Sequence, residues 1–476
     1  MENNKLKKES LNIVETIALS AAIMAPSANT SITVPLVIGI AGYSVGITFI
    51  FAILLTVLLS IAIIKFNQYF SSAGSLYTFT EKGLGKKAGF VSGWTLFLTY
   101  FLFALGSSAA LGSYVSGVFA LIGIHIGWLI ISLVFLAIAW LLAYRDITLS
   151  TRVMLLLEGI SITLILVLVA VIFVRVGHST GISTAPLKFN ANSLSSMARG
   201  TVMALVAFAG FEGTSCLGEE TRNPKKNIPV TIIGTVVFIG FFLMVSGYSQ
   251  VIGFGVNKDG ITALVTSLNP LNDLAAKYVS PAYALLITLG ISMSLLSCTI
   301  GCVCASSRIL FSMSRDGIIH KSLSKVHSKY STPHVAVSAV MIITMAVQLV
   351  YFILTRQDSG ALFGAAFTIA SLAVLVAYFL TTLSGVVYFY RMKIWKAQNL
   401  ILPLLAIIVL LISLVCNIYP IPSFPSNLYP YIILAWILIG LVFSALTKHP
   451  VNLQAADGDD YNAHLLAKPV DVEHSK

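Results

Sequence analysis

The strongest constraint on the fold of this chain is a series of long apolar runs. A helix that crosses a lipid bilayer needs about 20 mostly apolar residues. Runs of that length occur at 13–38, 42–64, 90–118, 127–144, 151–175, 195–217, 228–250, 281–310, 335–355, 361–389, 400–418 and 429–447. Because backbone groups find no water inside a bilayer, helices satisfy them within each run. The sequence therefore predicts an all-α integral membrane protein with twelve transmembrane helices.

The charges agree with a membrane protein and indicate its orientation. Only 10% of the 476 residues are charged, whereas soluble domains contain about 25%. The net charge of +11 comes from basic residues spread over short loops, a pattern typical of membrane topology rather than of nucleic-acid binding. On the twelve-helix plan, 23 of the 29 lysines and arginines lie on the side of the termini. The positive-inside rule then predicts a cell-membrane protein whose N-terminus (1–12) and polar tail (448–476) are both cytoplasmic.

The cysteines give no sign of a metal or disulfide site. All five lie in apolar segments, at Cys216, Cys298, Cys302, Cys304 and Cys416. No histidine accompanies the three that are close in sequence, and cysteine behaves as a small apolar residue in such surroundings. No phosphate-binding or catalytic motif occurs either. We therefore expect neither an enzyme nor a bound metal or organic cofactor.

Two of the apolar runs are interrupted near their middle. In the first run, Pro26 is followed by small polar residues at 27–33. Proline lacks an N–H group and clashes with the preceding turn, which predicts a break, with a simple kink as the alternative. In the run 195–217, Gly210 and Gly213 lie on either side of Glu212. Glycine weakens a helix and an acid in lipid is costly, so this run is also predicted to be broken.

The two interruptions occupy corresponding positions in two halves of the chain. If 13–175 and 195–389 are two five-helix repeats, each interruption lies in the first helix of its repeat. Two more helices follow in 400–447. Paired broken helices in corresponding repeats indicate the solute site of an inverted-repeat transporter. The sequence thus predicts a site where the two breaks meet.

The chemistry of a broken helix suggests what this site would bind. One half-helix offers N–H groups and the other offers C=O groups, each end carrying a partial charge of about half a unit. A zwitterionic amino acid needs both. We expect its carboxylate at the amides of 27–29 and its amine at the carbonyls near Ala25 and Ala209. The predicted substrate-binding residues are Ala25, Ser27, Ala28, Asn29, Phe208, Ala209, Gly210 and Phe211, with Phe208 as a candidate lid and Pro26 as a structural residue of the break.

Several motifs resemble a known family. The stretches that carry the resemblance read AFAGFE at 207–212 and GEETRNPKKNIP at 218–229, with further matches at 73–77, 83–85, 93–94, 307–317 and 332–333. They resemble the amino acid-polyamine-organocation (APC) permeases, in the family's order. The resemblance implies a LeuT-like five-plus-five inverted repeat with two C-terminal helices and alternating access. It also implies transport of amino acids or related amines, driven by protons or by exchange.

The chain departs from the family pattern at the first break. Many members have a glycine-rich break there, whereas this chain reads APSAN at 25–29. This departure leaves a second substrate class open, namely polyamines or other amine and amino acid derivatives.

The fifth predicted helix, 151–175, holds a second departure from the family pattern. Many family members carry a lysine where this chain has Ser161. Glu158 instead lies ~10 Å inside the helix end at 1.5 Å per residue. A carboxyl group is expensive to ionise inside the membrane, so Glu158 is a candidate to load and release a coupling proton. Pairing with Arg152 or reaching the membrane surface is the alternative.

The remaining charged residues of interest lie in or near the second break. The family signature includes an acid at Glu212, whose position suggests a structural role in accepting N–H groups beyond the break. In the loops that follow, Glu219, Glu220, Arg315 and Asp316 are candidates for ion pairs that close a cytoplasmic gate. Solvated loop charges are the alternative.

Overall fold

The structure is a computed structural model that describes residues 6–189, 194–394, 400–419 and 421–446. In this part of the chain all regular structure is helical except for one bridge between Leu11 and Thr221. The α-helices are α1 Ile13–Met24, α2 Pro26–Ala41, α3 Val45–Tyr69, α4 Leu76–Leu84, α5 Lys86–Leu121, α6 Trp128–Tyr144, α7 Ile147–Ser179, α8 Leu194–Val206, α9 Pro224–Phe254, α10 Lys258–Thr266, α11 Pro270–Tyr278, α12 Pro281–Arg315, α13 His334–Thr355, α14 Ser359–Arg391, α15 Ile401–Ile418 and α16 Tyr429–Leu446.

Many of these helices are long and apolar enough to cross a membrane. Within the described residues there are nine such stretches, the first of which, Ile13–Tyr69, runs through α1, α2 and α3. Helices α6 and α8 are apolar but shorter, with 17 and 13 residues. The prediction of an all-helical, multi-pass membrane protein is confirmed, while the count of twelve transmembrane helices stays a prediction.

The outer helices expose large apolar side chains that an aqueous surface would not tolerate. Leu156 on α7, Leu354 on α13 and Ile439 on α16 are 62%, 77% and 62% exposed. In the apolar stretch Ser426–Phe443, which includes most of α16, only 17% of the residues are buried. In the most apolar 18 residues of α5, 83% are buried. Apolar surface of this extent fits contact with lipid tails.

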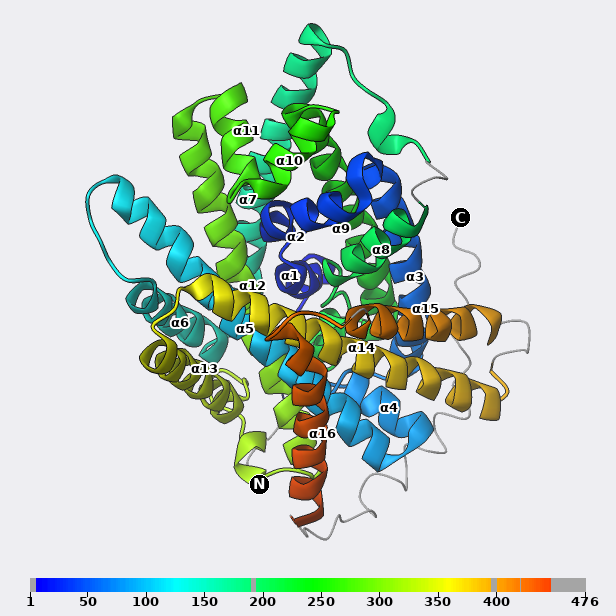
Figure 1. Cartoon of the computed structure of the whole chain (residues 1–476). Helices are drawn as coiled ribbons and strands as arrows, with labels where there is room; N and C mark the ends of the chain where they lie inside the picture. Colours follow the sequence, from blue (N-terminus) through cyan, green and yellow to red (C-terminus); the bar gives the residue numbers. More distant parts are fainter. Residues whose placement is uncertain (1–5, 190–193, 395–399, 420, 447–476) are drawn as a thin grey trace.

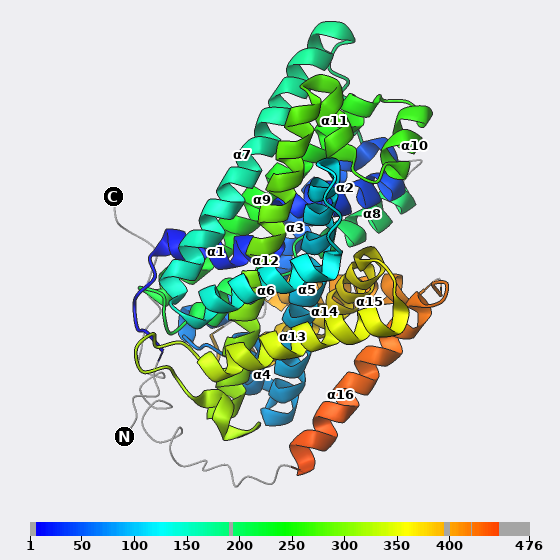
Figure 2. The ribbon, with the colours of Figure 1, turned by 90° about the vertical axis from the view of Figure 1, so that its left-hand side faces the viewer.

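The centre of the molecule is built around α1 (Figure 1). Helices α7, α9 and α12 pack against it, and α2 continues from its end (Figure 1). In the view of Figure 2, α16 lies at the outer edge of the molecule. The residues at both predicted interruptions, 22–28 and 207–218, are buried, as a site shielded from lipid requires.

Three short helices lie in the connections between the long ones. Helix α4 joins α3 to α5 at one end of the molecule, close to the N-terminal segment, and α10 and α11 lie toward the other end (Figure 2). Each is nine residues long. These helices were not predicted, because a search for runs of bilayer length does not detect them.

Candidate functional site

The first helix is broken at Ala25. Helix α1 ends at Met24, and Ala25 has the left-handed backbone angles φ 42° and ψ 59°. Pro26 is the first residue of α2, a position where its missing N–H is no loss and its fixed φ suits the helix. Pro26 thus starts a new half-helix rather than bending a continuous one.

The second break lies after α8. Residues 207–212 form turns, and the chain then continues as a 3₁₀ helix, Gly213–Leu217. Gly210 has φ +100°, and a Cβ there would lie 2.2 Å from Cγ2 of Ile23. A Cβ on Gly213 would lie 2.5 Å from Cδ1 of the same isoleucine. Glycine is therefore needed at 210 both for its backbone angle and for the close approach of α1.

Hydroxyl groups join the two broken segments. Ser20 Oγ donates to the carbonyl of Phe211 at 2.9 Å and accepts the Thr214 amide at 2.9 Å. Thr214 Oγ1 in turn donates to the Thr16 carbonyl at 3.2 Å. Buried backbone groups that a helix no longer satisfies need such partners. The breaks predicted from proline and glycine are thus held against each other by the side chains of Ser20 on α1 and Thr214 after the second break.

Asn29 links the carbonyl groups of both breaks. Its side-chain nitrogen donates to the carbonyl of Met24 at 2.6 Å and to that of Ala207 at 3.3 Å. Its side-chain oxygen accepts from Thr33 Oγ1 at 2.5 Å. The backbone amide of Asn29, expected to bind a carboxylate, is instead bonded to the Ala25 carbonyl at 2.9 Å. That expectation is corrected, because position 29 already lies inside the regular hydrogen-bond pattern of α2.

The other two amides at the start of α2 lie at its open end. The Ala28 amide donates to Ser294 Oγ of α12 at 3.3 Å. Ser27 is buried, and its hydroxyl has no partner among the described residues. The amides of Ser27 and Ala28 lie in the first turn of α2, where N–H groups have no partner within the helix, and their binding of a carboxylate stays a prediction.

Glu212 is buried and bound by two tyrosines. Tyr100 of α5 donates to Oε1 at 2.6 Å, and Tyr378 of α14 donates to Oε2. The amide of Gly210 donates to the Tyr378 hydroxyl at 3.3 Å. The two tyrosines fix the unwound segment to α5 and α14, and the expected structural role of Glu212 in accepting N–H groups beyond the break stays a prediction.

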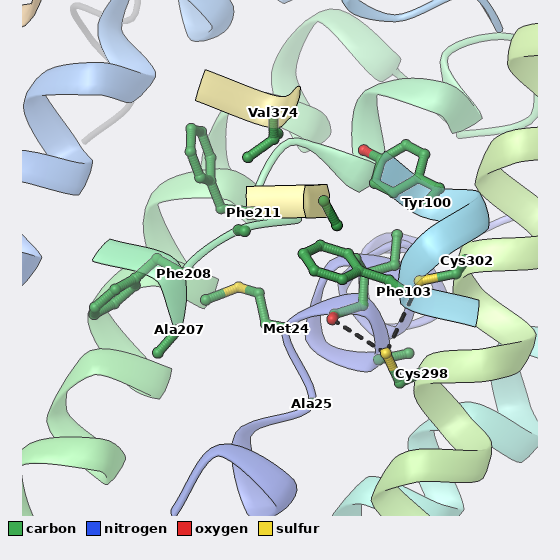
Figure 3. Close-up of a cluster of buried hydrophobic side chains, with 14 of the residues drawn as sticks. Met24, Ala25, Tyr100, Phe103, Ala207, Phe208, Phe211, Cys298, Cys302 and Val374 are labelled. Atoms are coloured by element: carbon green, nitrogen blue, oxygen red, sulfur yellow. Dashed lines mark hydrogen bonds between the residues drawn. The ribbon is translucent and has the colours of Figure 1, made fainter. Parts of the chain in front are cut away.

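The aromatic rings of the second break point away from the first. Figure 3 shows Phe208 and Phe211 on one side of Met24 and Phe103 of α5 on the other. The Phe211 ring packs against Tyr378 with centroids 5.1 Å apart. Phe208, Ala209 and Phe211 line a cavity of about 20 Å³, which is room for roughly one water molecule. In this conformation Phe208 therefore does not lie over the break as a lid.

Glu158 is buried on α7 and connects to the first break. Ser294 donates to its Oε1 at 2.7 Å and accepts the amide of Ala28. Its other oxygen has no partner among the described residues. Arg152, the alternative partner, instead bonds Glu15 at 2.8 Å. Ser161, at the position of the family's lysine, donates to the carbonyl of Gly290 in α12 at 2.7 Å.

Ion pairs lie between the segment after the second break and the end of α12. Arg308 is fully buried and bonds both oxygens of Glu220, at 2.6 and 2.9 Å. Arg315 bonds both oxygens of Glu219, at 2.8 and 3.1 Å, in a more exposed place. Two of the charges expected in gate pairs thus pair with each other, and Glu220 pairs with Arg308, which the sequence analysis had not singled out.

Asp316 takes a different partner. Its carboxyl group accepts from the Tyr77 hydroxyl of α4 at 2.8 Å. Burial raises the pKa of Asp316, although the Tyr77 hydroxyl and the charge of Arg315 favour the ionised form. The residue thus joins α4 to the end of α12.

Several residues of the site carry no signal in the sequence. Ser294, Tyr378 and Met24 are single residues within apolar helices. Arg308 offered a signal, since an arginine seven residues inside the end of α12 is unusual for a span. Tyr100, the other partner of Glu212, is likewise a single residue within an apolar helix.

Together the fold and the site define a multi-pass helical membrane protein with two helices broken at one buried place. The sequence profile of the family described as amino acid permease matches residues 11–442. The chain belongs to the amino acid permease family.

The chain is similar to several transporters. Branched-chain amino acid permease BcaP of Bacillus subtilis (strain 168) is 27% identical over 318 residues, which are 62% of this chain and 65% of that protein. The methylthioribose transporter of the same organism is 25% identical over 62% of this chain and 64% of that protein. The chain therefore spans just under two thirds of these two relatives. Low-affinity putrescine importer PlaP of Escherichia coli (strain K12) is 24% identical over 78% of this chain and 82% of that protein.

A solved structure shares the fold. A mutant manganese transporter of Eremococcus coleocola superposes with a TM-score of 0.57 over 94% of this chain and 97% of that one. The sequences are 12% identical. The likeness therefore concerns the fold alone.

Proposed function

We propose that this protein is a secondary active transporter that moves amino acids, or closely related amines, across the cell membrane by alternating access. The observation that carries the proposal is the meeting of the two breaks at Asn29, whose side chain reaches a carbonyl of each. Backbone carbonyls at one place and the amides of Ser27 and Ala28 in the first turn of α2 at another suit the amine and carboxylate of a zwitterion. The names of the similar permeases support this substrate class.

The proposal includes twelve spans in a five-plus-five inverted repeat with two further helices, and both termini in the cytoplasm. The stretch Ile13–Tyr69 holds two spans, divided at residues 42–44, and α6 and the broken α8 segment add two more to the nine long stretches. The excess of lysine and arginine on the side of the termini supports the orientation.

The substrate class is the first point to test. Purified protein in proteoliposomes would be given labelled L-leucine, L-phenylalanine, putrescine and methylthioribose under proton, sodium or exchange conditions. We expect saturable uptake of at least one amine-bearing compound. Failure to take up any member of the panel under every condition would contradict the proposed function.

The second candidate substrate is a polyamine. The similar putrescine importer, matched over 78% of this chain, favours it. The acid nearest the breaks, Glu212, is already bound by Tyr100 and Tyr378, which leaves a dication without a free carboxylate at the second break. Preference for L-leucine over putrescine in the same panel would support the amino acid, and the reverse would support the polyamine.

We propose that Glu158 carries the coupling proton. It is buried without a counter-charge, one of its oxygens has no partner among the described residues, and Ser294 connects the other to the start of α2. An ionised carboxyl group in this place is costly, whereas a protonated one is tolerated. A change in the protonation of Glu158 would therefore alter the hydrogen bond between Ser294 and the Ala28 amide, next to the proposed substrate site.

The prediction for Glu158 concerns coupling rather than binding. Glu158→Gln, which resembles the protonated acid, should still exchange substrate across the membrane. It should not concentrate substrate when a proton gradient is imposed. Measuring exchange and gradient-driven uptake in the same proteoliposomes separates the two. Concentrative uptake at the wild-type level by Glu158→Gln would rule out this role.

A further inference from the structure

One nitrogen atom satisfies the carbonyl groups of both helix breaks. Asn29 Nδ2 donates to the Met24 carbonyl at the end of α1 and to the Ala207 carbonyl after α8, at 2.6 and 3.3 Å. These carbonyls belong to chain segments separated by more than 170 residues. They converge closely enough that a single donor atom reaches both.

A primary ammonium group has the same requirement as this carboxamide nitrogen. Both present N–H donors at one atom, and an ammonium carries a full charge in addition, which makes its hydrogen bonds to carbonyls stronger. An ammonium nitrogen at the position of Asn29 Nδ2 would find the same two acceptors. The two groups cannot occupy that position together.

The surroundings of Asn29 allow its side chain to leave. Residues 22–28 are buried, whereas Asn29 is only partly buried. Its oxygen is held by one side-chain hydroxyl, that of Thr33, at 2.5 Å. Rotation of the side chain would therefore break three hydrogen bonds without moving the backbone, because the Asn29 amide stays bonded to the Ala25 carbonyl.

We propose that the Asn29 side chain is a built-in competitor of the substrate's ammonium group. It occupies the carbonyls of Met24 and Ala207 in the substrate-free protein and is displaced when a primary amine binds. This inference rests on the proposed function and adds a specificity rule to it. The site takes ligands with a primary ammonium group, and its affinity for them is lowered by the bonds that Asn29 makes.

The test is the sign of the change in affinity in the full-length Asn29→Ala variant. Binding of L-leucine, L-phenylalanine and putrescine would be measured by thermal shift and by half-saturation of uptake. Removal of the competitor should tighten binding of the preferred amine by about tenfold, because net hydrogen bonds are each worth a few-fold or more in an equilibrium constant. Binding of 4-methylpentanoate, which is leucine without its amine, should not tighten.

Two further variants control the experiment. Thr33→Val releases the Asn29 oxygen but leaves its nitrogen in place, so it should tighten amine binding in the same direction by only about two- to threefold. It also serves if Asn29→Ala does not fold. Asn272→Ala removes an asparagine that joins α11 to Thr288 of α12, away from the breaks, and should leave affinity unchanged.

The outcomes separate this inference from the proposed function. If the wild type takes up no compound of the panel, the proposed function fails. If the wild type transports but Asn29→Ala binds amines equally or more weakly, Asn29 is not a competitor and the inference alone fails. It also fails if wild-type uptake requires sodium and Asn29→Ala abolishes that requirement, since Asn29 would then hold a cation.

Discussion

At the scale of single residues, the site depends on how closely two backbones approach. Ile23, in the last turn of α1, lies where a Cβ on Gly210 or Gly213 would be, at 2.2 and 2.5 Å. The two glycines differ in one respect. Gly210 has a backbone angle of φ +100° that other residues rarely adopt, and Gly213 lies in a 3₁₀ helix with ordinary angles. The steric and backbone requirements can therefore be separated.

We predict that alanine is harmful at both glycines but can be rescued at only one. Gly213→Ala clashes with Cδ1 of Ile23, which Ile23→Val removes, so the double variant should recover most of the loss. Gly210→Ala meets Cγ2, which valine retains, and adds backbone strain of about 1–3 kcal/mol, so Ile23→Val should not rescue it. Unfolding in detergent and uptake in proteoliposomes would measure both.

The control for these variants is Gly234→Ala. Gly234 lies in α9 with no atom within 4 Å of the added Cβ, so alanine should be neutral or slightly stabilising there. Recovery of Gly210→Ala by Ile23→Val would show that the close approach, rather than the backbone angle, is what requires glycine at 210.

At the scale of helices, α12 connects the site to the ion pairs at its end. Ser294 in its middle bonds Glu158 and the start of α2, and Arg308 near its C-terminal end bonds Glu220 after the second break. A shift of α12 would therefore act on both broken segments. The two ion pairs near this end differ in environment, since Arg308 is 1% exposed and Arg315 is 38% exposed.

We predict unequal effects when each pair is broken by the same substitution. Glu220→Gln leaves Arg308 charged and buried without a counter-charge, which should destabilise the protein by about 3–5 kcal/mol. Glu219→Gln breaks a partly exposed pair and should cost about 0–1 kcal/mol. Thermal unfolding of both variants in detergent, at low and high salt, would measure the difference. Equal losses would show that the burial of Arg308 does not decide the strength of its pair.

At the scale of the whole molecule, features encoded locally could be predicted and those created by folding could not. The long apolar runs and the breaks at Pro26 and Gly210 were predicted because hydrophobicity, a missing N–H and a missing Cβ act within the segment that carries them. The partners of Glu212 were not predicted. Tyr100 and Tyr378 are 112 and 166 residues away from it, in helices that meet it only in the folded chain, and a tyrosine in an apolar run usually signals packing.

The orientation of the whole molecule is itself a prediction that the structure does not test. If the positive-inside rule holds, the connection that contains Leu268 lies outside the cell and the one that contains Lys321 lies inside. Leu268 is 94% exposed and Lys321 is exposed in the structure, so a cysteine at either position would be open to reagents. The native cysteines do not interfere if Cys416 is replaced, because the other four are buried.

A membrane-impermeant maleimide would read this orientation directly in a Cys416→Ala background. Leu268→Cys should react in intact cells, and Lys321→Cys should react only after the membrane is opened. The reverse pattern would show that the molecule has the opposite orientation. The ion pairs Arg308–Glu220 and Arg315–Glu219 would then lie at the outer face of the membrane. The two breaks would remain at the same depth, so the proposed substrate site would survive such a result while the proposed cytoplasmic gate would not.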